Sequence, residues 1–138
     1  MSVASRAGRW TLRGIGALGV LFGLLTLVEG GSILFGAPEA VAAAGAYVPF
    51  VLWFNFLAGF AYVVAGVALL AGRRWARHLA LAIAAATLLV FAAFGVHIAL
   101  GGAFEARTVG AMVLRSGFWV LAAAIAAGVL RGTTGRAS

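Results

Sequence analysis

The sequence predicts an all-α integral membrane protein, a bundle of four transmembrane helices. Of its 138 residues, 64% are hydrophobic and 9% are charged, whereas soluble domains contain roughly 45–50% apolar and about 25% charged residues. A soluble fold of this length cannot bury so much apolar surface, but a lipid bilayer can solvate it. The apolar residues also form four stretches of about 20 residues, the length that a helix needs to cross a bilayer.

Each stretch is expected to be one helix, because a helix satisfies its own backbone hydrogen bonds in lipid. The period-two alternation that is typical of a membrane barrel is absent. We predict one four-helix domain, residues 1–138, whose spans cover residues 12–35, 50–71, 79–100 and 109–130.

Glycine and proline mark the connections between these spans. Pro38 suits the first turn of a short helix at residues 39–44, which Gly45 would end. We expect this helix to lie on the outer membrane surface. A tight turn at residues 72–77 would join the second and third spans, and a glycine pair at residues 101–102 would end the third.

The basic residues indicate the orientation of the bundle. All ten are arginines, and eight of them flank span ends that would share one side of the membrane: Arg6, Arg9, Arg13, Arg73, Arg74, Arg77, Arg131 and Arg136. Positive flanks stay in the cytoplasm, so both termini are predicted to be cytoplasmic (N-in/C-in). A composition rich in Ala and Arg is typical of a GC-rich bacterial genome, so we place the chain in a bacterial cytoplasmic (inner) membrane.

Charge and cysteine content exclude several other classes. The net charge of +7 sits on arginines beside apolar spans, where they meet anionic lipid headgroups, so we expect the lipid bilayer and no nucleic acid as partner. A cleaved signal peptide is an alternative for the first span, but its apolar run exceeds the usual length of about 7–15 residues and contains Glu29. With no cysteine, the chain has no disulfide, thiol redox centre or thiolate metal site.

Glycines recur at helix-packing intervals in the first two spans. Gly16, Gly23 and Gly30 follow one another at seven-residue spacing, as do Gly59 and Gly66. Small residues let membrane helices approach closely, so we expect these glycines to serve packing.

Each span carries one polar residue near its outer end: Glu29, Asn55, His97 and Arg115. Counted inward from the span ends at about 1.5 Å per residue, all four lie roughly 5–9 Å below the outer boundary. Ionisable groups at such depth face the bundle interior or water. These four residues therefore define one predicted polar layer in the outer third of the bundle.

Three more residues complete the predicted ligand-binding site. Tyr62 lies two helical turns deeper than Asn55, and Trp119 shares a helix face with Arg115, on whose guanidinium it could stack. Glu105, together with Arg107, would cover the layer from the outer loop.

The polar layer also has a purely structural interpretation. Glu29 and Arg115 are expected to approach within salt-bridge or single-water distance, and such a pair could simply fix how two helices meet. Asn55 could serve only as a hydrogen-bonding residue between helices. His97 could bond Glu105 or a lipid headgroup.

We favour a binding function for the layer over catalysis, with a small amphiphilic or anionic ligand. Arg115 suits a carboxylate, phosphate or carbonyl group, and Glu29 and His97 could exchange protons with it. The inner halves of the spans carry no ionisable residue, so we expect a pocket open to the outer side and no pore. Ligand sites have mostly apolar walls, here expected from Phe22, Phe54, Phe91, Phe94 and Phe118.

Other functions remain open, and the sequence names no cofactor and no catalytic residue. The chain could be an accessory subunit of a membrane partner or a homo-oligomer. It could also be a metal-dependent or redox enzyme, because Glu29, His97 and Glu105 would supply two carboxylates and one imidazole to iron or zinc.

The run LVEGG at residues 27–31 resembles the first helix of small multidrug-resistance transporters, which have four helices and an essential membrane-embedded glutamate. This resemblance implies a proton-coupled transporter acting as a dimer, with Glu29 as that glutamate. The chain departs from the pattern in two ways: Glu29 lies near the outer end of its span, and the arginine bias favours a single orientation.

A second resemblance rests on Arg13-Gly14 at the start of the first span, VAGVALL at residues 64–70 and RRWA at residues 73–76. These sequence segments are similar to those of uncharacterised DoxX-like four-helix proteins of bacterial membranes. The resemblance covers architecture, implies an accessory role, and assigns no site residue.

Overall fold

The computed structural model describes residues 6–134, with side chains for residues 6–130, and this range forms five α-helices and no strand. The helices are α1 (Arg6–Leu34), α2 (Pro38–Ala44), α3 (Pro49–Leu70), α4 (Ala76–Ala99) and α5 (Ala106–Thr134). All except α2 are long and apolar enough to cross a membrane. The predicted all-α bundle with four membrane-spanning helices is confirmed.

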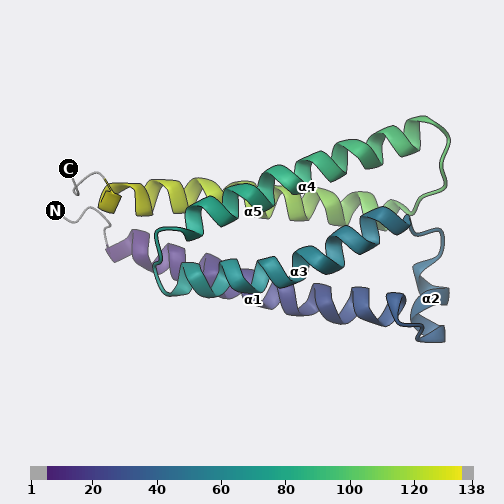
Figure 1. Ribbon diagram of the computed structural model, residues 1–138, viewed down its shortest axis with the longest axis horizontal. Coiled ribbons are helices and arrows are strands. Elements are labelled where there is room, and N and C mark those ends of the chain that lie inside the picture. The colour runs from purple at the N-terminus through teal and green to yellow at the C-terminus, as the bar shows by residue number, and fades with distance from the viewer. Residues whose placement is uncertain (1–5, 135–138) are drawn as a thin grey trace.

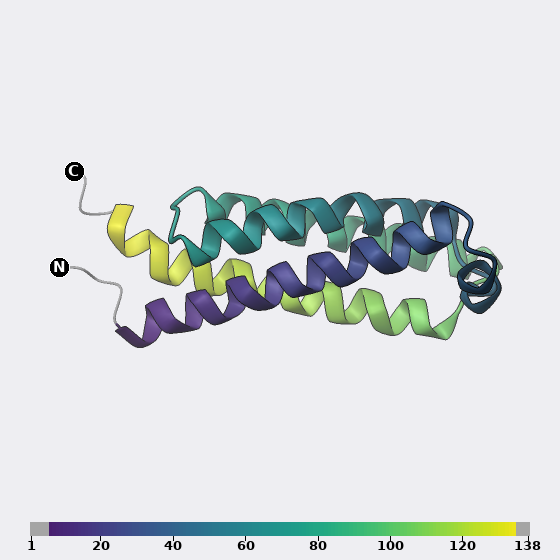
Figure 2. The same cartoon turned by 90° about the horizontal axis from the view of Figure 1, so that it is seen from below.

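The four long helices run along one axis and alternate in direction (Figures 1 and 2). One end of the bundle, here called the α2 end, carries α2 and the loop at residues 100–105. The other, the turn end, carries the α3–α4 turn, the start of α1 and the end of α5 (Figure 1). The helices form two close pairs, α1 with α3 and α4 with α5.

Two helices extend beyond the spans that hydropathy predicts. α1 begins at Arg6 and α5 continues to Thr134, so each contains 29 residues, about 43 Å of helix against a hydrocarbon core about 30 Å thick. Arginine is a good helix former, so a charged flank can extend a helix into water. Arg136, one of the arginines expected in the cytoplasm, lies outside the described residues, and the side chain of Arg131 is likewise not described.

The glycines of α1 and α3 form the closest helix–helix contact in the bundle. A Cβ atom built on Gly16 would lie 2.7 Å from the carbonyl oxygen of Gly66, and one built on Gly23 would lie 2.8 Å from that of Gly59. Seven residues are two helical turns, so both contacts fall on one face of each helix. The predicted packing role is confirmed, and this interface fixes how α1 is rotated about its own axis.

The buried apolar residues form two clusters: a small one at the α2 end, formed by Val48, Val51, Phe94 and Met112, and a larger one that extends to the turn end. The larger cluster includes Trp119 and Tyr62, both fully buried, and ends near Leu12 and Leu130. Large apolar side chains point outward instead, among them Val28 (69% exposed) and Leu89 (72% exposed). An apolar surface on every spanning helix suits lipid, as expected of a multi-pass membrane protein.

The α3–α4 turn is closed by a left-handed glycine. Gly72 has a φ of +68°, a conformation that glycine adopts without steric cost. Its N–H donates to Leu69 O at 3.1 Å, and that of Arg73 donates to Ala68 O at 3.0 Å, the pattern of a Schellman C-cap. The turn presents Arg73 and Arg74 as exposed residues.

Candidate functional site

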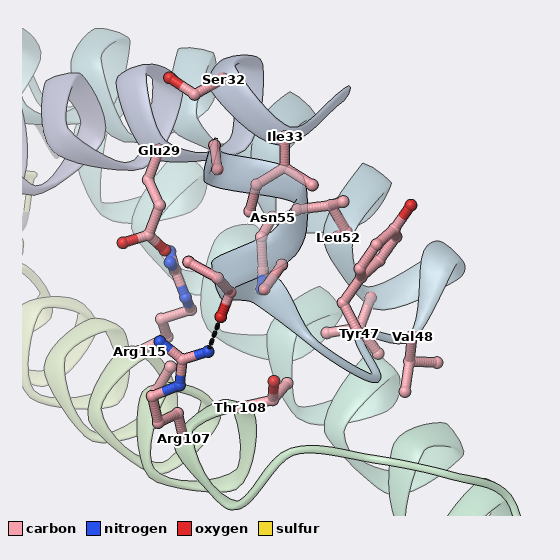
Figure 3. A pocket seen from close by; sticks show the side chains of 15 residues that line it. Glu29, Ser32, Ile33, Tyr47, Val48, Leu52, Asn55, Arg107, Thr108 and Arg115 are labelled. Atoms are coloured by element: carbon pink, nitrogen blue, oxygen red, sulfur yellow. Dashed lines mark hydrogen bonds between the residues drawn. The ribbon is translucent and has the colours of Figure 1, made fainter. Parts of the chain in front are cut away.

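A cavity of about 500 Å³ lies at the α2 end between α1, α3 and α5, with α2 along its side (Figure 3). Part of the cavity wall is formed by small and aliphatic residues such as Ala43, Val51 and Ala111. The polar and ionisable residues that line it are Glu29, Ser32, Tyr47, Asn55, Arg107, Thr108 and Arg115.

Arg115 is the most deeply buried charged group on this wall, with 7% of its surface exposed. Its Nη1 donates to Thr26 Oγ1 at 3.0 Å and to Tyr62 Oη at 3.5 Å. The guanidinium carbon also lies 5.2 Å from the ring centroid of Phe22 and 5.9 Å from that of Tyr62. Aromatic faces attract cations, so two hydroxyls and two rings hold this charge in place.

Glu29 and Arg115 form no direct ion pair in the described structure, although both side chains line the same cavity. Nη1 of Arg115 donates to the hydroxyl of Thr26, which lies one helical turn deeper on α1 than Glu29. The glycine contacts with α3 set the rotation of α1, and in that rotation Thr26 is buried while Glu29 is exposed along the cavity wall. Among the described residues, Arg115 therefore has no direct carboxylate partner, and Glu29 is the carboxylate that shares its cavity.

Two buried polar atoms on the cavity residues lack hydrogen-bond partners within the described part of the chain. They are Nε of Arg115, a donor, and Oδ1 of Asn55, an acceptor. Buried polar groups are nearly always hydrogen-bonded in folded proteins, but a donor on α5 and an acceptor on α3, each on a residue that lines the cavity, are left without a partner in the described protein. Ser32, in contrast, uses its hydroxyl on Val28 O of its own helix at 2.8 Å.

Two residues of the α4–α5 segment hold α2 beside the cavity. The Glu105 carboxylate accepts a hydrogen bond from the N–H of Ala46 at 2.8 Å, and Arg107 Nη2 donates to the carbonyl of Ala43. Glu105 does not itself line the cavity, whereas Arg107 does. Both residues thus act at the outer edge of the site, where the sequence placed them.

His97 does not line the cavity, although the sequence assigned it to the same layer as the other three residues. Its Nε2 is 2.9 Å from Ala103 O, and its ring packs against Phe94 and Phe50 at centroid distances of 6.4 and 6.3 Å. The structure therefore gathers three members of the polar layer and leaves the fourth against the α4–α5 loop. His97 bonds Ala103 and not Glu105.

The proposed metal ligands are not brought together. Glu29, His97 and Glu105 form no cluster of potential ligands, nor does any other group of three among the described histidine and acidic residues. Glu105 is engaged by Ala46 and His97 by Ala103. The two-carboxylate, one-imidazole site expected for the enzyme alternative is absent from the geometry.

Trp119 and the phenylalanines that were expected at the site do not line the cavity. Trp119 packs on Tyr62 at 5.0 Å between centroids, not on the guanidinium, which lies over Phe22 and Tyr62 instead. The end of its indole ring would be 3.3 Å from a Cβ on Gly19, so Trp119 fills the space beside α1. None of the five phenylalanines expected as walls lines the cavity, namely Phe22, Phe54, Phe91, Phe94 and Phe118.

The site contains elements that the sequence argument did not assign. Thr26 is the direct partner of Arg115, and Tyr47 and the alanines of α2 form part of the wall. Thr26 was recognisable as the polar residue on the face of Glu29, but only the packing of α1 against α3 shows which of the two meets Arg115.

The charges on the wall favour an anion. Arg107 and Arg115 contribute two positive charges and Glu29 one negative charge, so the lining carries a formal charge of +1. Apolar residues next to these groups suit the hydrocarbon part of an amphiphile. No protein-family model matches this chain, and neither a curated protein nor a solved structure matches it.

Proposed function

We propose that this protein binds a small amphiphile with a carboxylate or similar anionic headgroup in the cavity at the α2 end. The observation that carries the proposal is Arg115, a buried cation that has neutral partners and an unpaired Nε and that lines a cavity of about 500 Å³. An isolated buried charge costs several kcal/mol. A ligand anion beside Arg115 would offset that cost.

The two unpaired atoms specify the headgroup more closely. Nε of Arg115 can donate to a ligand oxygen, while Oδ1 of Asn55 can accept from a ligand hydroxyl or amide. A headgroup with an acidic oxygen and a neighbouring donor, such as a hydroxy acid or an acylated amino acid, would satisfy both. Among the described residues, Glu29 is the one carboxylate on the cavity wall, and His97 does not line it.

Binding is favoured over conduction because the apolar core continues from below the cavity to the turn end. Tyr62, Trp119 and Ala126 are fully buried along this path. The cluster there is apolar, and the other buried polar groups of the described bundle below Arg115 and Thr26 are the neutral hydroxyls of Thr87 and Ser116. An ion or proton path would need polar groups or water. The protein acts in this proposal as a receptor or carrier for the amphiphile, alone or as the binding subunit of a larger assembly.

We further propose that the cavity faces the outer side of a bacterial inner membrane, with both termini in the cytoplasm. The arginine-rich turn end supports this orientation. The chain has no native cysteine, so single cysteines report topology directly. With a membrane-impermeant maleimide on spheroplasts, Ala42→Cys should label and Arg74→Cys should label only after lysis; the reverse pattern would refute this orientation.

A photoreactive fatty acid tests the binding proposal. The full chain is placed in nanodiscs with a carboxylate-headed probe that carries a diazirine in its acyl chain, and adducts are mapped by peptide mass spectrometry. Adducts should concentrate on the cavity walls, around Leu52, Ala43 and Ala111. A cavity-filling Ala111→Phe variant should reduce them at least fivefold. Val113→Phe, on the exposed face of the same helix, should not.

The proposal fails if the adducts spread evenly over the lipid-facing surface, or if Ala111→Phe and Val113→Phe label like the parent protein. An uncharged probe with the same chain and an alcohol headgroup provides the chemical control. It should label the cavity several-fold less, because it forms no charged contact with Arg115.

A further inference from the structure

A second hollow lies between α4 and α5 in the half of the bundle nearest the turn end, with a volume of about 610 Å³. Small residues create it: Ala84, Ala123 and Ala127 line a groove whose edges carry Leu81 and Leu88. At its turn end the groove meets Arg77 and His78, its only ionisable lining residues. This hollow is separate from the cavity at the α2 end, with which it shares no residue.

The length of the groove matches one leaflet of a bilayer. From Arg77 to Leu88 the helix rises by about 16 Å, and half of a hydrocarbon core is about 15 Å thick. The groove thus begins at the membrane interface, where Trp75 is exposed beside the arginines, and ends near the bilayer midplane. A single acyl chain lying along α4 would have this extent.

The charge at the turn end of the groove has one sign. Arg77, which lines the groove, is half-buried, and its Nε has no hydrogen-bond partner among the described residues. Arg73 and Arg74 are exposed on the adjoining turn. No acidic residue lines the groove. The complementary partner is therefore an anion with an apolar chain attached.

We propose that the α4–α5 groove binds one anionic phospholipid of the adjacent leaflet, with an acyl chain along the alanines and the headgroup phosphate at Arg77 and His78. Each arginine near an anionic headgroup contributes about 1 kcal/mol, which is about a fivefold gain in affinity. The tightest-binding lipid should thus be anionic. This site would join α4 to α5 from the lipid side, near the end where the arginines indicate a cytoplasmic face.

Native mass spectrometry of the full chain tests the site. The delipidated protein in mild detergent is titrated with phosphatidylglycerol or with phosphatidylcholine of identical chains. The first phosphatidylglycerol should bind at least fivefold more tightly than phosphatidylcholine. Arg77→Gln should remove most of this preference, whereas Arg73→Gln, which lies outside the groove, should lower it by less.

A groove-filling substitution separates a seated chain from a general surface attraction. Ala124 lines the groove but is exposed, so Ala124→Phe can fill it without disturbing the core. In this variant the affinity for the first bound phosphatidylglycerol should fall at least tenfold. Ala93→Phe, at an exposed position of α4 outside both hollows, should have no such effect.

Three results would overturn the proposal. One is equal binding by Ala124→Phe and the parent chain, which would place the lipid elsewhere. Another is competition by glycerol phosphate that displaces the lipid fully in the millimolar range, which would show a phosphate site without a chain. The third is a parent dimer that Ala124→Phe converts to a monomer, which would show that a second copy occupies the groove.

Discussion

The guanidinium of Arg115 on α5 donates to the hydroxyl of Thr26 on α1 across 3.0 Å. This bond links two helices that are far apart in sequence and otherwise have few contacts. Its acceptor is neutral, so the bond orients the cation without neutralising it. Arg115 is thereby aimed at the cavity with its charge available to a ligand.

Removing the Thr26 hydroxyl should destabilise the fold. Thr26→Val keeps the shape of the side chain but leaves Arg115 with one neutral partner fewer, and a hydrogen bond to a charged group contributes about 1.5–3 kcal/mol. The free energy of unfolding, measured by denaturant titration in mixed micelles, should fall by about that amount.

Thr87→Val is the matched control for this change. Thr87 is fully buried, but its hydroxyl bonds only the carbonyl of Ile83 on its own helix, at 2.7 Å. Such a local bond adds little to helix stability, so Thr87→Val should lower the free energy of unfolding by less than about 1 kcal/mol. Equal losses for the two variants would show that the Arg115–Thr26 bond has no special weight.

Glu29 and Arg115 should behave as independent groups. Because no ion pair joins them, the effects of Glu29→Gln and Arg115→Gln on the free energy of unfolding should add in the double variant to within about 0.5 kcal/mol. A true buried pair would lose about 3–5 kcal/mol when one partner is removed. A coupling energy above about 1.5 kcal/mol in the double-mutant cycle would show that the two charges do pair.

Gly16 should tolerate no side chain. The nearest atoms to a Cβ there are the backbone oxygen of Gly66 at 2.7 Å and the backbone nitrogen of Leu70 at 2.9 Å, and neither can move without shifting α3. Gly16→Ala should therefore cost about 1–3 kcal/mol, the usual penalty for overpacking.

Gly95 provides the comparison, because it is also helical but has no atom within 4 Å of a Cβ position. Gly95→Ala should leave stability unchanged or raise it by up to about 1 kcal/mol. Thermal unfolding followed by circular dichroism distinguishes the two variants. A stable Gly16→Ala protein would contradict the close α1–α3 contact.

Glu105 should hold α2 in place. Glu105→Ala removes the acceptor of the Ala46 N–H, and a charged hydrogen bond of about 1.5 kcal/mol corresponds to roughly a tenfold change in local opening. Hydrogen–deuterium exchange at residues 38–46 should accelerate by about that factor. Glu39→Ala, an exposed change in the first turn of α2, should have a much smaller effect, and similar acceleration in both variants would mean that Glu105 does not hold the segment.

Helix positions were predictable from the sequence because the bilayer fixes them. Length and hydropathy alone place the four spanning helices, since lipid admits few other structures. Local residue preferences placed Pro38 at the start of the short helix and gave the spaced glycines a packing role, but they did not show that the glycines of α1 pack on those of α3. The helix ends at Arg6 and Thr134 were not predicted. Beyond the membrane a helix end depends on local helix propensity, and hydropathy gives no information about it.

The sequence predicted which residues share a level along the helix axes, but it did not predict how each helix is rotated about its own axis. Counting residues placed Glu29 and Arg115 at similar depths, yet a rotation of about 60° about the axis of α1 separates Glu29 from Thr26. The glycine contacts decide between them. His97 shows the same limit, since its depth is shared with the layer while Ala103 and Phe94 hold it elsewhere.

The central claim is that Arg115 anchors an anionic ligand, and the affinity of the photoreactive fatty acid in two variants tests it most directly. A buried charged contact contributes about 1.5–3 kcal/mol, so Arg115→Gln should weaken binding more than tenfold. Arg107 is exposed at the cavity edge, and exposed charge contacts contribute about 0–1 kcal/mol, so Arg107→Gln should weaken it less than about fivefold. Equal affinities for the parent and Arg115→Gln proteins, both folded by circular dichroism, would contradict the account.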